Sequence, residues 1–310
     1  MRQRCLILGG GGFIGSHLAQ YLVNDGYNVR VFDVKNFGKK NLLSFIDKLE
    51  IVEGDFSNPV DVSLAIKDVD FIFHLISTTI PSNSVLNPSY DVESNVVPTI
   101  NLLQQCVDVK IKKIIYLSSG GTVYGIPNQI PIPEDHSCNP INSYGITKRT
   151  IESYFKLYNK LWGLDACIFR LSNPYGERQN PKANQGVIPV FLKKAIENES
   201  IEVWGDGQVV RDYIYIGDVI RLLVQSIENP TPEIVYNVGS GIGTSLNELL
   251  NIIREKFNPQ ININYLMGRN FDVPINVLDT ALVKSRFNWK PTVDLVDGLD
   301  ILYNHLLLNK

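Results

Sequence analysis

Residues 5–33 read CLILGGGGFIGSHLAQYLVNDGYNVRVFD. In this stretch a short apolar run leads into four glycines, then into a segment of helical period and a second β-branched run. A strand, a glycine turn, a helix and a second strand in this order open the βαβ unit that binds dinucleotides. The stretch therefore predicts an α/β fold built on a parallel sheet.

The glycines of this stretch follow the spacing GxxGxxG at Gly9, Gly12 and Gly15. Glycine is required where a turn needs a positive φ, where backbone approaches a pyrophosphate, and where a helix touches a strand. The amino terminus of the helix then offers N–H groups to the phosphates. Asp33 ends the second strand, where a carboxylate accepts hydrogen bonds from ribose hydroxyls and repels a 2′-phosphate, so we expect NAD rather than NADP. Asp55, after the third strand, is a candidate adenine contact or a simple turn residue.

The rest of the amino-terminal half alternates short apolar runs with longer helical patterns, which is typical of a sheet covered by helices on both faces. We expect strands near residues 5–8, 28–32, 50–52, 71–75, 113–117 and 166–170. We expect helices near residues 15–24, 59–66, 92–106 and 143–161. The pattern predicts a Rossmann-type doubly wound parallel sheet.

A change of lobe is expected after Arg170, where SNPYGERQNPKANQG (residues 172–186) is rich in Pro, Gly and Asn. Beyond it we expect helices near 187–197 and 218–228, strands near 201–204 and 234–238, and three more helices that end at Leu307. The apolar run 234–238 is a candidate to return to the first sheet. We therefore expect a dinucleotide-binding domain over residues 1–172, completed by about 213–239, and a smaller α/β lobe for substrate over 173–212 and 240–310.

The chain has 310 residues, and its 29 basic and 32 acidic residues give a net charge of −3. This balance favours neither nucleic acid nor an anionic membrane as a partner. The four cysteines are scattered without metal-ligand spacing, so we expect reduced thiols and no metal site. The glycines interrupt any amino-terminal signal helix, and no apolar run reaches the length of a membrane span, so we expect a cytoplasmic protein.

Tyr144 and Lys148 lie four residues apart in SYGITK (residues 143–148), at the start of a helical pattern, so both side chains project from one helix face. A phenol ionises near about pH 10, but a nearby cation stabilises the phenolate and brings it into the working range of a general base. The pair is therefore a candidate catalytic centre. The alternative is an exposed tyrosine and lysine on a helix surface.

Eight motifs follow one another along the chain: GGGGFIGSHL, GDF, HLISTT, SSGGTVYG, SYGITK, RLSNPYG, VVRDYIYIGDV and VGSGIGTSLNEL. With them the chain resembles, nearly end to end, the extended short-chain dehydrogenases/reductases of the nucleotide-sugar epimerase/dehydratase family, and most of all their 4-epimerases. The resemblance implies that Tyr144 is the base and acid on the sugar C4 hydroxyl and that Lys148 binds the nicotinamide ribose. It also implies a homodimer in which the helices near 92–106 and 143–161 form an intersubunit four-helix bundle.

The remaining site residues are also implied by the resemblance. The cofactor contacts are Gly9, Gly12, Phe13, Ile14, Gly15, Asp33, Asp55, Phe56, Ser77, Asn95, Ser119, Tyr144 and Lys148. The contacts to the UDP- or dTDP-linked sugar are Thr122, Asn173, Arg211, Arg269 and Asp272. An arginine suits the diphosphate because its planar fork binds phosphate oxygens bidentately, although surface salt bridges are the alternative role for Arg211 and Arg269.

The chain departs from the family pattern at Gly120, where many epimerases carry a hydroxyl residue beside the tyrosine and lysine. Thr122 is the preferred substitute and Ser119 the other candidate. Dehydratases carry an Asp and a Glu where this chain has Gly121 and Thr122, which disfavours dehydration because that reaction needs titratable groups.

Two reactions at C4 remain, and both would supply a building block for surface polysaccharide such as O-antigen. The preferred one is 4-epimerisation, in which NAD oxidises C4 and the same NADH returns hydride to the other face. The other is NAD(P)H-dependent reduction of a dTDP-4-keto-6-deoxyhexose, which Gly120 and the apolar Ile80 and Pro81 favour. A sensor that binds dinucleotide without catalysis is the alternative of another class, and the Tyr144–Lys148 pair argues against it.

Overall fold

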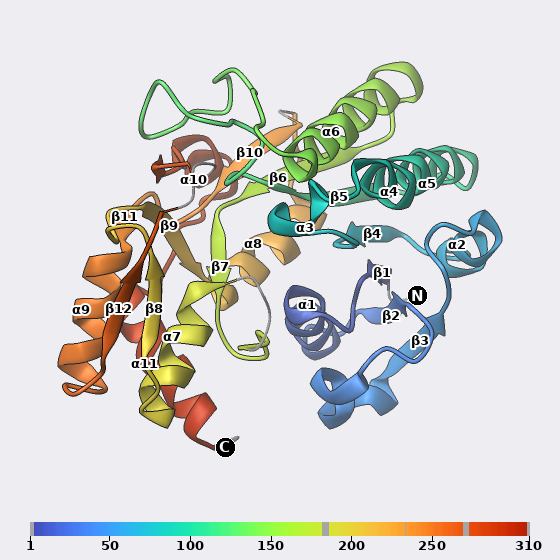
Figure 1. Cartoon of the computed structure of the whole chain (residues 1–310). Helices are drawn as coiled ribbons and strands as arrows, with labels where there is room; N and C mark the ends of the chain where they lie inside the picture. The colour runs from blue at the N-terminus through green and yellow to red at the C-terminus, as the bar shows by residue number, and fades with distance from the viewer. Residues whose placement is uncertain (1–2, 182–185, 233, 269–272, 309–310) are drawn as a thin grey trace. The chain divides into compact units, whose positions relative to one another are not determined.

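The computed structural model describes residues 3–181, 186–232, 234–268 and 273–308. Its largest sheet has seven strands in the order β10-β6-β5-β4-β1-β2-β3 (Figure 1). The strands are β1 (Arg4–Leu8), β2 (Asn28–Asp33), β3 (Leu49–Glu53), β4 (Phe71–His74), β5 (Lys113–Ser119), β6 (Ala166–Leu171) and β10 (Val235–Val238). β1 pairs in parallel with β2 and β4, and the pairs β2–β3 and β4–β5 are parallel as well. The predicted doubly wound sheet is confirmed, and β10 returns to it as expected.

Helices connect the strands of this sheet, and their starts follow from local sequence. They are α1 (Phe13–Asn24), the 3-10 helix η1 (Lys39–Lys48), α2 (Pro59–Ile66), α3 (Pro81–Ser84), α4 (Pro88–Asp91), the π-helical turn η2 (Val92–Val96), α5 (Val97–Asp108), α6 (Ser143–Trp162) and α8 (Ile216–Glu228). Pro59 occupies the first turn of α2, and the Asn58 side chain caps that helix by accepting from the Val60 amide. The single helix predicted over 92–106 is instead a π-helical turn followed by α5, a difference that hydrophobic spacing does not reveal.

The strands of this sheet are apolar because helices bury them. All four residues of β4 are buried, as are six of the seven in β5 and all six in β6. One core cluster joins them to apolar side chains of α2, α5 and α6. The strand order of this sheet reverses between the neighbouring strands β4 and β1. Open α/β sheets bind ligands at the carboxyl ends of the strands at such a point.

The described chain divides into two compact units. The first comprises residues 1–123, 140–170 and 220–236, and the second comprises 124–139, 171–219 and 237–310. The second unit has its own core, to which α7, β8, α9 and α11 contribute. Its elements are β7 (Asn173–Tyr175), α7 (Val187–Glu197), β8 (Ile201–Trp204), β9 (Val210–Tyr215), β11 (Gly243–Ser245), α9 (Leu246–Lys256), β12 (Ile263–Leu266), β13 (Ile275–Asn276), α10 (Ala281–Phe287) and α11 (Leu295–Leu308).

The second unit contains short strands that the hydrophobic pattern did not predict. β9 pairs with β7 and β13 in parallel and with β11 antiparallel, and β12 pairs in parallel with β8. Two to six residues are too few to show a period, so these strands depend on partners that are distant in sequence. Among the described residues, no helix has both the length and the apolar character to cross a membrane.

Candidate active site

The glycine turn between β1 and α1 has the geometry that its spacing predicts. Gly9 has φ +85°, a left-handed conformation that side chains rarely adopt. A Cβ on Gly15 would lie 2.3 Å from the Gly9 carbonyl oxygen and 2.6 Å from the Gly10 Cα, so the helix and the turn touch at this residue. A Cβ on Gly12 would meet only the Gly9 oxygen, at 3.5 Å, so the backbone is open at the start of α1. The turn thus leaves the helix amino terminus accessible to an anionic ligand.

Asp33 at the end of β2 holds this turn. Its Oδ2 accepts the Gly11 amide at 2.9 Å, and its Oδ1 accepts the Val34 amide at 2.9 Å. Phe13 and Ile14 are half-buried in the first turn of α1.

Asp55 and Phe56 follow β3 and face in different directions. Asp55 is exposed and accepts the amide and hydroxyl of Ser57 at 2.8 and 2.7 Å, which holds the pKa of its carboxyl below the usual value. Asp55 therefore has the geometry of a turn residue. The Phe56 ring is buried in the core against His74, so only its backbone is available to a ligand.

Tyr144 and Lys148 lie in the first turns of α6, on the face that packs toward β5. Lys148 is buried, its Nζ donates to the Leu117 carbonyl oxygen at 3.0 Å, and this Nζ lies 5.5 Å from the centroid of the Tyr144 ring. The helix starts here because the Asn142 side chain accepts the Gly145 amide, and because Ser84 Oγ accepts the Tyr144 amide at 3.0 Å. The predicted pairing of the two side chains on one helix face is confirmed.

The pKa values of the two groups are governed by burial more than by their mutual attraction. The pKa of Tyr144 is raised to about 12, chiefly by burial and in smaller part by the Asp91 carboxylate, while Ser77 opposes both. Burial lowers the pKa of Lys148 to about 8, and Asp91 and Glu152 oppose that shift. Desolvation therefore dominates the pKa of this phenol, and the expectation that Lys148 brings it into the working range of a general base stays a prediction.

The other hydroxyl and amide residues predicted for this site lie in the same unit as Tyr144. Ser77, which is exposed, donates to the Thr79 carbonyl oxygen at 3.0 Å and lies close enough to Tyr144 to lower the pKa of that phenol. Thr122 Oγ1 is buried and has no hydrogen-bond partner among the described residues, whereas Ser119 is half-buried at the end of β5. Asn95 is buried in the π-helical turn, where its Oδ1 accepts the Thr78 amide at 3.0 Å. Asn95 thus supports the segment that carries Ser77.

The second unit contains two of the residues predicted to bind the nucleotide. Asn173 Nδ2 donates to the Asp212 carbonyl oxygen at 3.1 Å, and Arg211 Nη1 donates to the Val210 and Val273 carbonyl oxygens at 2.9 and 2.7 Å. Both residues line one cavity of about 260 Å³. Arg269 and Asp272 lie outside the described residues.

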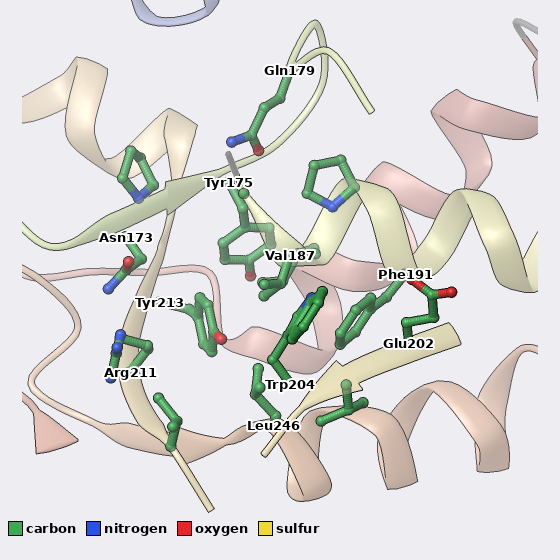
Figure 2. A pocket seen from close by; sticks show the side chains of 16 residues that line it. Asn173, Tyr175, Gln179, Val187, Phe191, Glu202, Trp204, Arg211, Tyr213 and Leu246 are labelled. Carbon is green, nitrogen blue, oxygen red and sulfur yellow. The ribbon is translucent and has the colours of Figure 1, made fainter. Parts of the chain in front are cut away.

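This cavity is rich in aromatic side chains that the sequence did not single out. Figure 2 shows Trp204, Tyr213 and Phe191, which come from β8, β9 and α7, turned toward the same space. The Trp204 side chain is 44% exposed, and the buried Tyr213 hydroxyl has no hydrogen-bond partner among the described residues. An exposed tryptophan at the end of the alternating strand IEVW was the one available signal. Aromatic faces, an arginine and free polar groups together suit a ligand with a flat ring and an anionic group.

Within the described ranges, no group of three or more His, Cys, Asp or Glu side chains is arranged to hold a metal ion. The arrangement instead provides proton-transfer groups in one unit and a polar, aromatic cavity in the other.

Comparison with known proteins found a matching family model, relatives of similar sequence and solved structures of similar fold. The model of the "NAD dependent epimerase/dehydratase family" matches residues 5–239. A protein of Methanocaldococcus jannaschii described as a putative UDP-glucose 4-epimerase is 40% identical, over 98% of this chain and 98% of its own. The dTDP-4-dehydro-6-deoxyglucose reductase of Escherichia coli is 32% identical, over 96% of this chain and 95% of its own. The crystal structure of the Thermotoga maritima UDP-glucose 4-epimerase with UDP-glucose matches with a TM-score of 0.94 and 30% identity, over 99% of both chains.

Proposed function

Because the chain belongs to the NAD dependent epimerase/dehydratase family, we propose that it is an NAD-dependent enzyme that inverts C4 of a nucleoside-diphosphate sugar. The observation that carries this proposal is the pair of the half-buried Tyr144 and the buried Lys148 beside the carboxyl end of β5, in the same unit as the glycine turn. Full-length similarity to two proteins described as UDP-glucose 4-epimerases, one of them provisionally, supports UDP-glucose and UDP-galactose as the first substrates to test.

The first unit fits NAD. The open backbone at Gly12 and the amino terminus of α1 suit the pyrophosphate, and Asp33 at the end of β2 suits the adenosine ribose. The cofactor contacts proposed in sequence otherwise lie at the same edge of the sheet, with Asp55 and Phe56 contributing less than their motif indicates. When bound, oxidised NAD supplies the acceptor for the C4 hydride and a positive charge that favours the Tyr144 phenolate.

Tyr144 moves the proton at the C4 hydroxyl. It takes this proton when C4 is oxidised and returns it when the 4-keto group is reduced, so one residue serves as base and then as acid. Lys148 holds a positive charge near the ring and binds the nicotinamide ribose. Ser77 turns its hydroxyl hydrogen from the Thr79 carbonyl oxygen toward the developing phenolate oxygen, and Thr122, whose hydroxyl has no partner in the described structure, binds the sugar O4. These two hydroxyls replace the one that the chain lacks at Gly120.

The second unit binds the nucleoside diphosphate in its aromatic cavity. Trp204 offers an exposed ring face for stacking a base, and Tyr213 offers a hydroxyl for hydrogen bonding. Arg211 carries the charge for the diphosphate, and Asn173 lies beside it in the same cavity. The dinucleotide-binding domain and the substrate lobe then correspond to the two compact units, except that residues 124–139, 171–172, 213–219 and 237–239 belong to the second unit. The product supplies surface polysaccharide such as O-antigen.

The chain also forms a homodimer through α5 and α6 and works in the cytoplasm. The outer face of α6 exposes Ile146, Leu157 and Leu161, which are 53%, 42% and 58% exposed, and this supports a contact with a second copy. The free thiols of the described cysteines, three of them buried, support a reducing compartment.

A second candidate is a 4-ketoreductase for a dTDP-4-keto-6-deoxyhexose. Gly120 and the 32% identity to a reductase of that kind favour it. In this reaction the protonated Tyr144, whose pKa of about 12 keeps it neutral at physiological pH, acts only as an acid.

One assay separates these functions. The purified protein is incubated with UDP-glucose, UDP-galactose or a dTDP-4-keto-6-deoxyhexose, with and without NADH, while NADH absorbance and product stereochemistry are followed. Inversion at C4 without net loss of NADH supports the epimerase. Stoichiometric loss of NADH selects the reductase, and binding of NAD without turnover of any of these sugars contradicts both.

Replacement of Tyr144 by Phe tests the catalytic assignment. We expect kcat to fall by about 10²–10⁴-fold, because the phenol oxygen that moves the C4 proton is lost while the ring still fills its site. The circular dichroism spectrum serves as the control and should stay unchanged. An enzyme with full activity after this replacement would show that another group moves the proton.

A further inference from the structure

Asp91 is the last residue of α4, and its carboxylate is completely buried. Thr79 Oγ1 and Asn95 Nδ2 donate to Oδ1 at 2.6 and 3.1 Å. Ser143 Oγ and Thr147 Oγ1 donate to Oδ2 at 2.8 and 3.0 Å. A buried charge satisfied by four side-chain donors costs little to keep, but it becomes expensive when the donors are moved away.

The two oxygens of this carboxylate bind two different segments. Oδ1 binds the segment after β4, which carries Ser77, through Thr79 and through Asn95, whose own Oδ1 accepts the Thr78 amide. Oδ2 binds the first turns of α6 through Ser143 and Thr147. Ser143 immediately precedes Tyr144, and Thr147 immediately precedes Lys148. Asp91 therefore binds the helix at the residues next to both members of the pair.

The carboxylate also acts on the same pair through space. It raises the pKa of Tyr144 and that of Lys148, which favours the protonated form of each. Glu152 acts on Lys148 in the same direction, but its carboxylate is paired with Arg170 at 2.7 Å. The other titratable groups nearby are Tyr116, whose pKa is raised well above its usual value by burial, and His74, whose pKa is lowered by burial to about 3 and which is therefore neutral.

We propose that Asp91 is a positioning residue for the reaction at C4, whose two carboxylate oxygens hold the Ser77 segment against the first turns of α6 and thereby set the positions of Tyr144 and Lys148 relative to that segment. The proposal rests on the proposed function only for the identity of the reaction. The contact between the two segments is a property of the protein without substrate.

The test compares Asp91→Ala and Asp91→Asn with Asp108→Asn, a matched control on the exposed end of α5. In Asp91→Ala we expect kcat to fall about 100-fold, because displacement of a reacting group by about 1 Å has this effect, while the Kd for NAD stays within about twofold. Asn accepts through one atom and donates through the other, and the hydroxyl donors can rotate to match it. Asp91→Asn should therefore recover kcat to within about tenfold of the parent. The rise in kcat with pH should occur at lower pH in Asp91→Asn than in the parent, because a negative charge that opposes the Tyr144 phenolate is gone.

Several outcomes overturn the proposal. A folded Asp91→Ala enzyme with kcat within threefold of the parent would do so, as would an Asp91→Asn enzyme with an unshifted pH profile. A purely structural role would lower the melting temperature of both variants without changing kcat per folded molecule. If Asp91→Ala does not fold, the pH profile of Asp91→Asn decides between a positioning role and a purely structural role for Asp91.

A crystal structure of Asp91→Asn without substrate is informative even if no sugar is turned over. We expect Ser143 and Thr79 to keep contact with the new side chain, and the Ser77 segment to remain against the first turns of α6. A Ser77 segment that stays in place in crystals of Asp91→Ala would contradict the positioning role. Absence of activity in the parent enzyme, with the segment displaced in Asp91→Ala, would instead contradict the proposed reaction alone.

Discussion

At the scale of single residues, burial decides which protonation states the site contains. Tyr144 and Lys148 have the spacing of a phenolate and its stabilising cation, yet their pKa values of about 12 and about 8 move toward the two neutral forms. Desolvation disfavours both charges at once, although the cation lies 5.5 Å from the ring. The side chains alone therefore suit proton donation, and a further positive charge is needed before the phenol acts as a base.

His74 gives a prediction about stability at this same scale. It is buried between Phe56 and Tyr116, its Nε2 lies 2.9 Å from Thr99 Oγ1, and burial lowers its pKa from 6.5 to about 3. Between these two values the unfolded chain binds a proton that the native protein does not. Native stability is therefore complete above about pH 6.5 and is lost as the pH falls.

We expect the free energy of unfolding to fall by about 2–3 kcal/mol more between pH 7 and pH 4.5 in the parent than in His74→Gln. Urea unfolding at several pH values measures this difference, and the carboxylates common to both proteins cancel in it. Parallel pH dependences would show that His74 is not responsible for the acid sensitivity.

At the scale of elements, the junction of β1 and α1 depends on the absence of a side chain at Gly15. In Gly15→Ala the new Cβ would meet backbone atoms at 2.3 and 2.6 Å, so the turn must shift. We expect NAD affinity to fall at least about tenfold, or about 1.4 kcal/mol, as measured by calorimetric titration. Gly38→Ala is the matched control, because nothing lies within 4 Å of its Cβ. Unchanged NAD affinity in Gly15→Ala would argue against this turn as the pyrophosphate site.

The packing of α6 against β5 and β6 depends on a buried ion pair. Glu152 accepts from Arg170 Nε and Nη2 at 3.0 and 2.7 Å, and from Ser118 Oγ at 2.6 Å, with both charged side chains almost fully buried. We expect Glu152→Gln to lower the free energy of unfolding by about 3–5 kcal/mol, because it leaves the Arg170 charge uncompensated.

The control for this ion pair is Arg149→Met, which removes a partly exposed contact of 3.3 Å to the same glutamate. We expect it to cost less than about 1 kcal/mol in chemical denaturation. The double variant Glu152→Leu with Arg170→Met should be more stable than Glu152→Gln. Equal losses in Glu152→Gln and Arg149→Met would refute the assignment of stability to the buried pair.

At the scale of the whole molecule, the exposed apolar face of α6 leads to a prediction about assembly. We expect sedimentation of the parent as a dimer at micromolar concentration, and dissociation of Leu157→Lys, because a charge placed in an apolar contact loses its hydration. Leu64→Lys on α2 makes the same change at a leucine that is 62% exposed and should leave the dimer intact. A monomeric parent, or equal dissociation in both variants, would exclude this face as the interface.

Most of the first unit could be predicted because its signals are local. The glycine spacing, the apolar runs of β4 and β5, and the four-residue step from Tyr144 to Lys148 each reflect constraints within a few residues. Strands β7, β9, β11, β12 and β13 of the second unit and the cavity around Trp204 could not be predicted in this way, because their partners are far away in sequence. The π-helical turn at Val92–Val96 could not be predicted because hydrophobic spacing does not distinguish it from an α-helix.

The sequence by itself determined the doubly wound sheet, the family and the residues that are available for chemistry, since these follow from short-range patterns of glycine, apolar and ionisable residues. Only the tertiary structure decided how those residues are held and charged. The contacts of Asp91 join residues 79, 95, 143 and 147, and the pKa values of Tyr144 and Lys148 depend on everything that buries them. Desolvation and long-range hydrogen bonding are properties of the assembled core, so no local pattern specifies them.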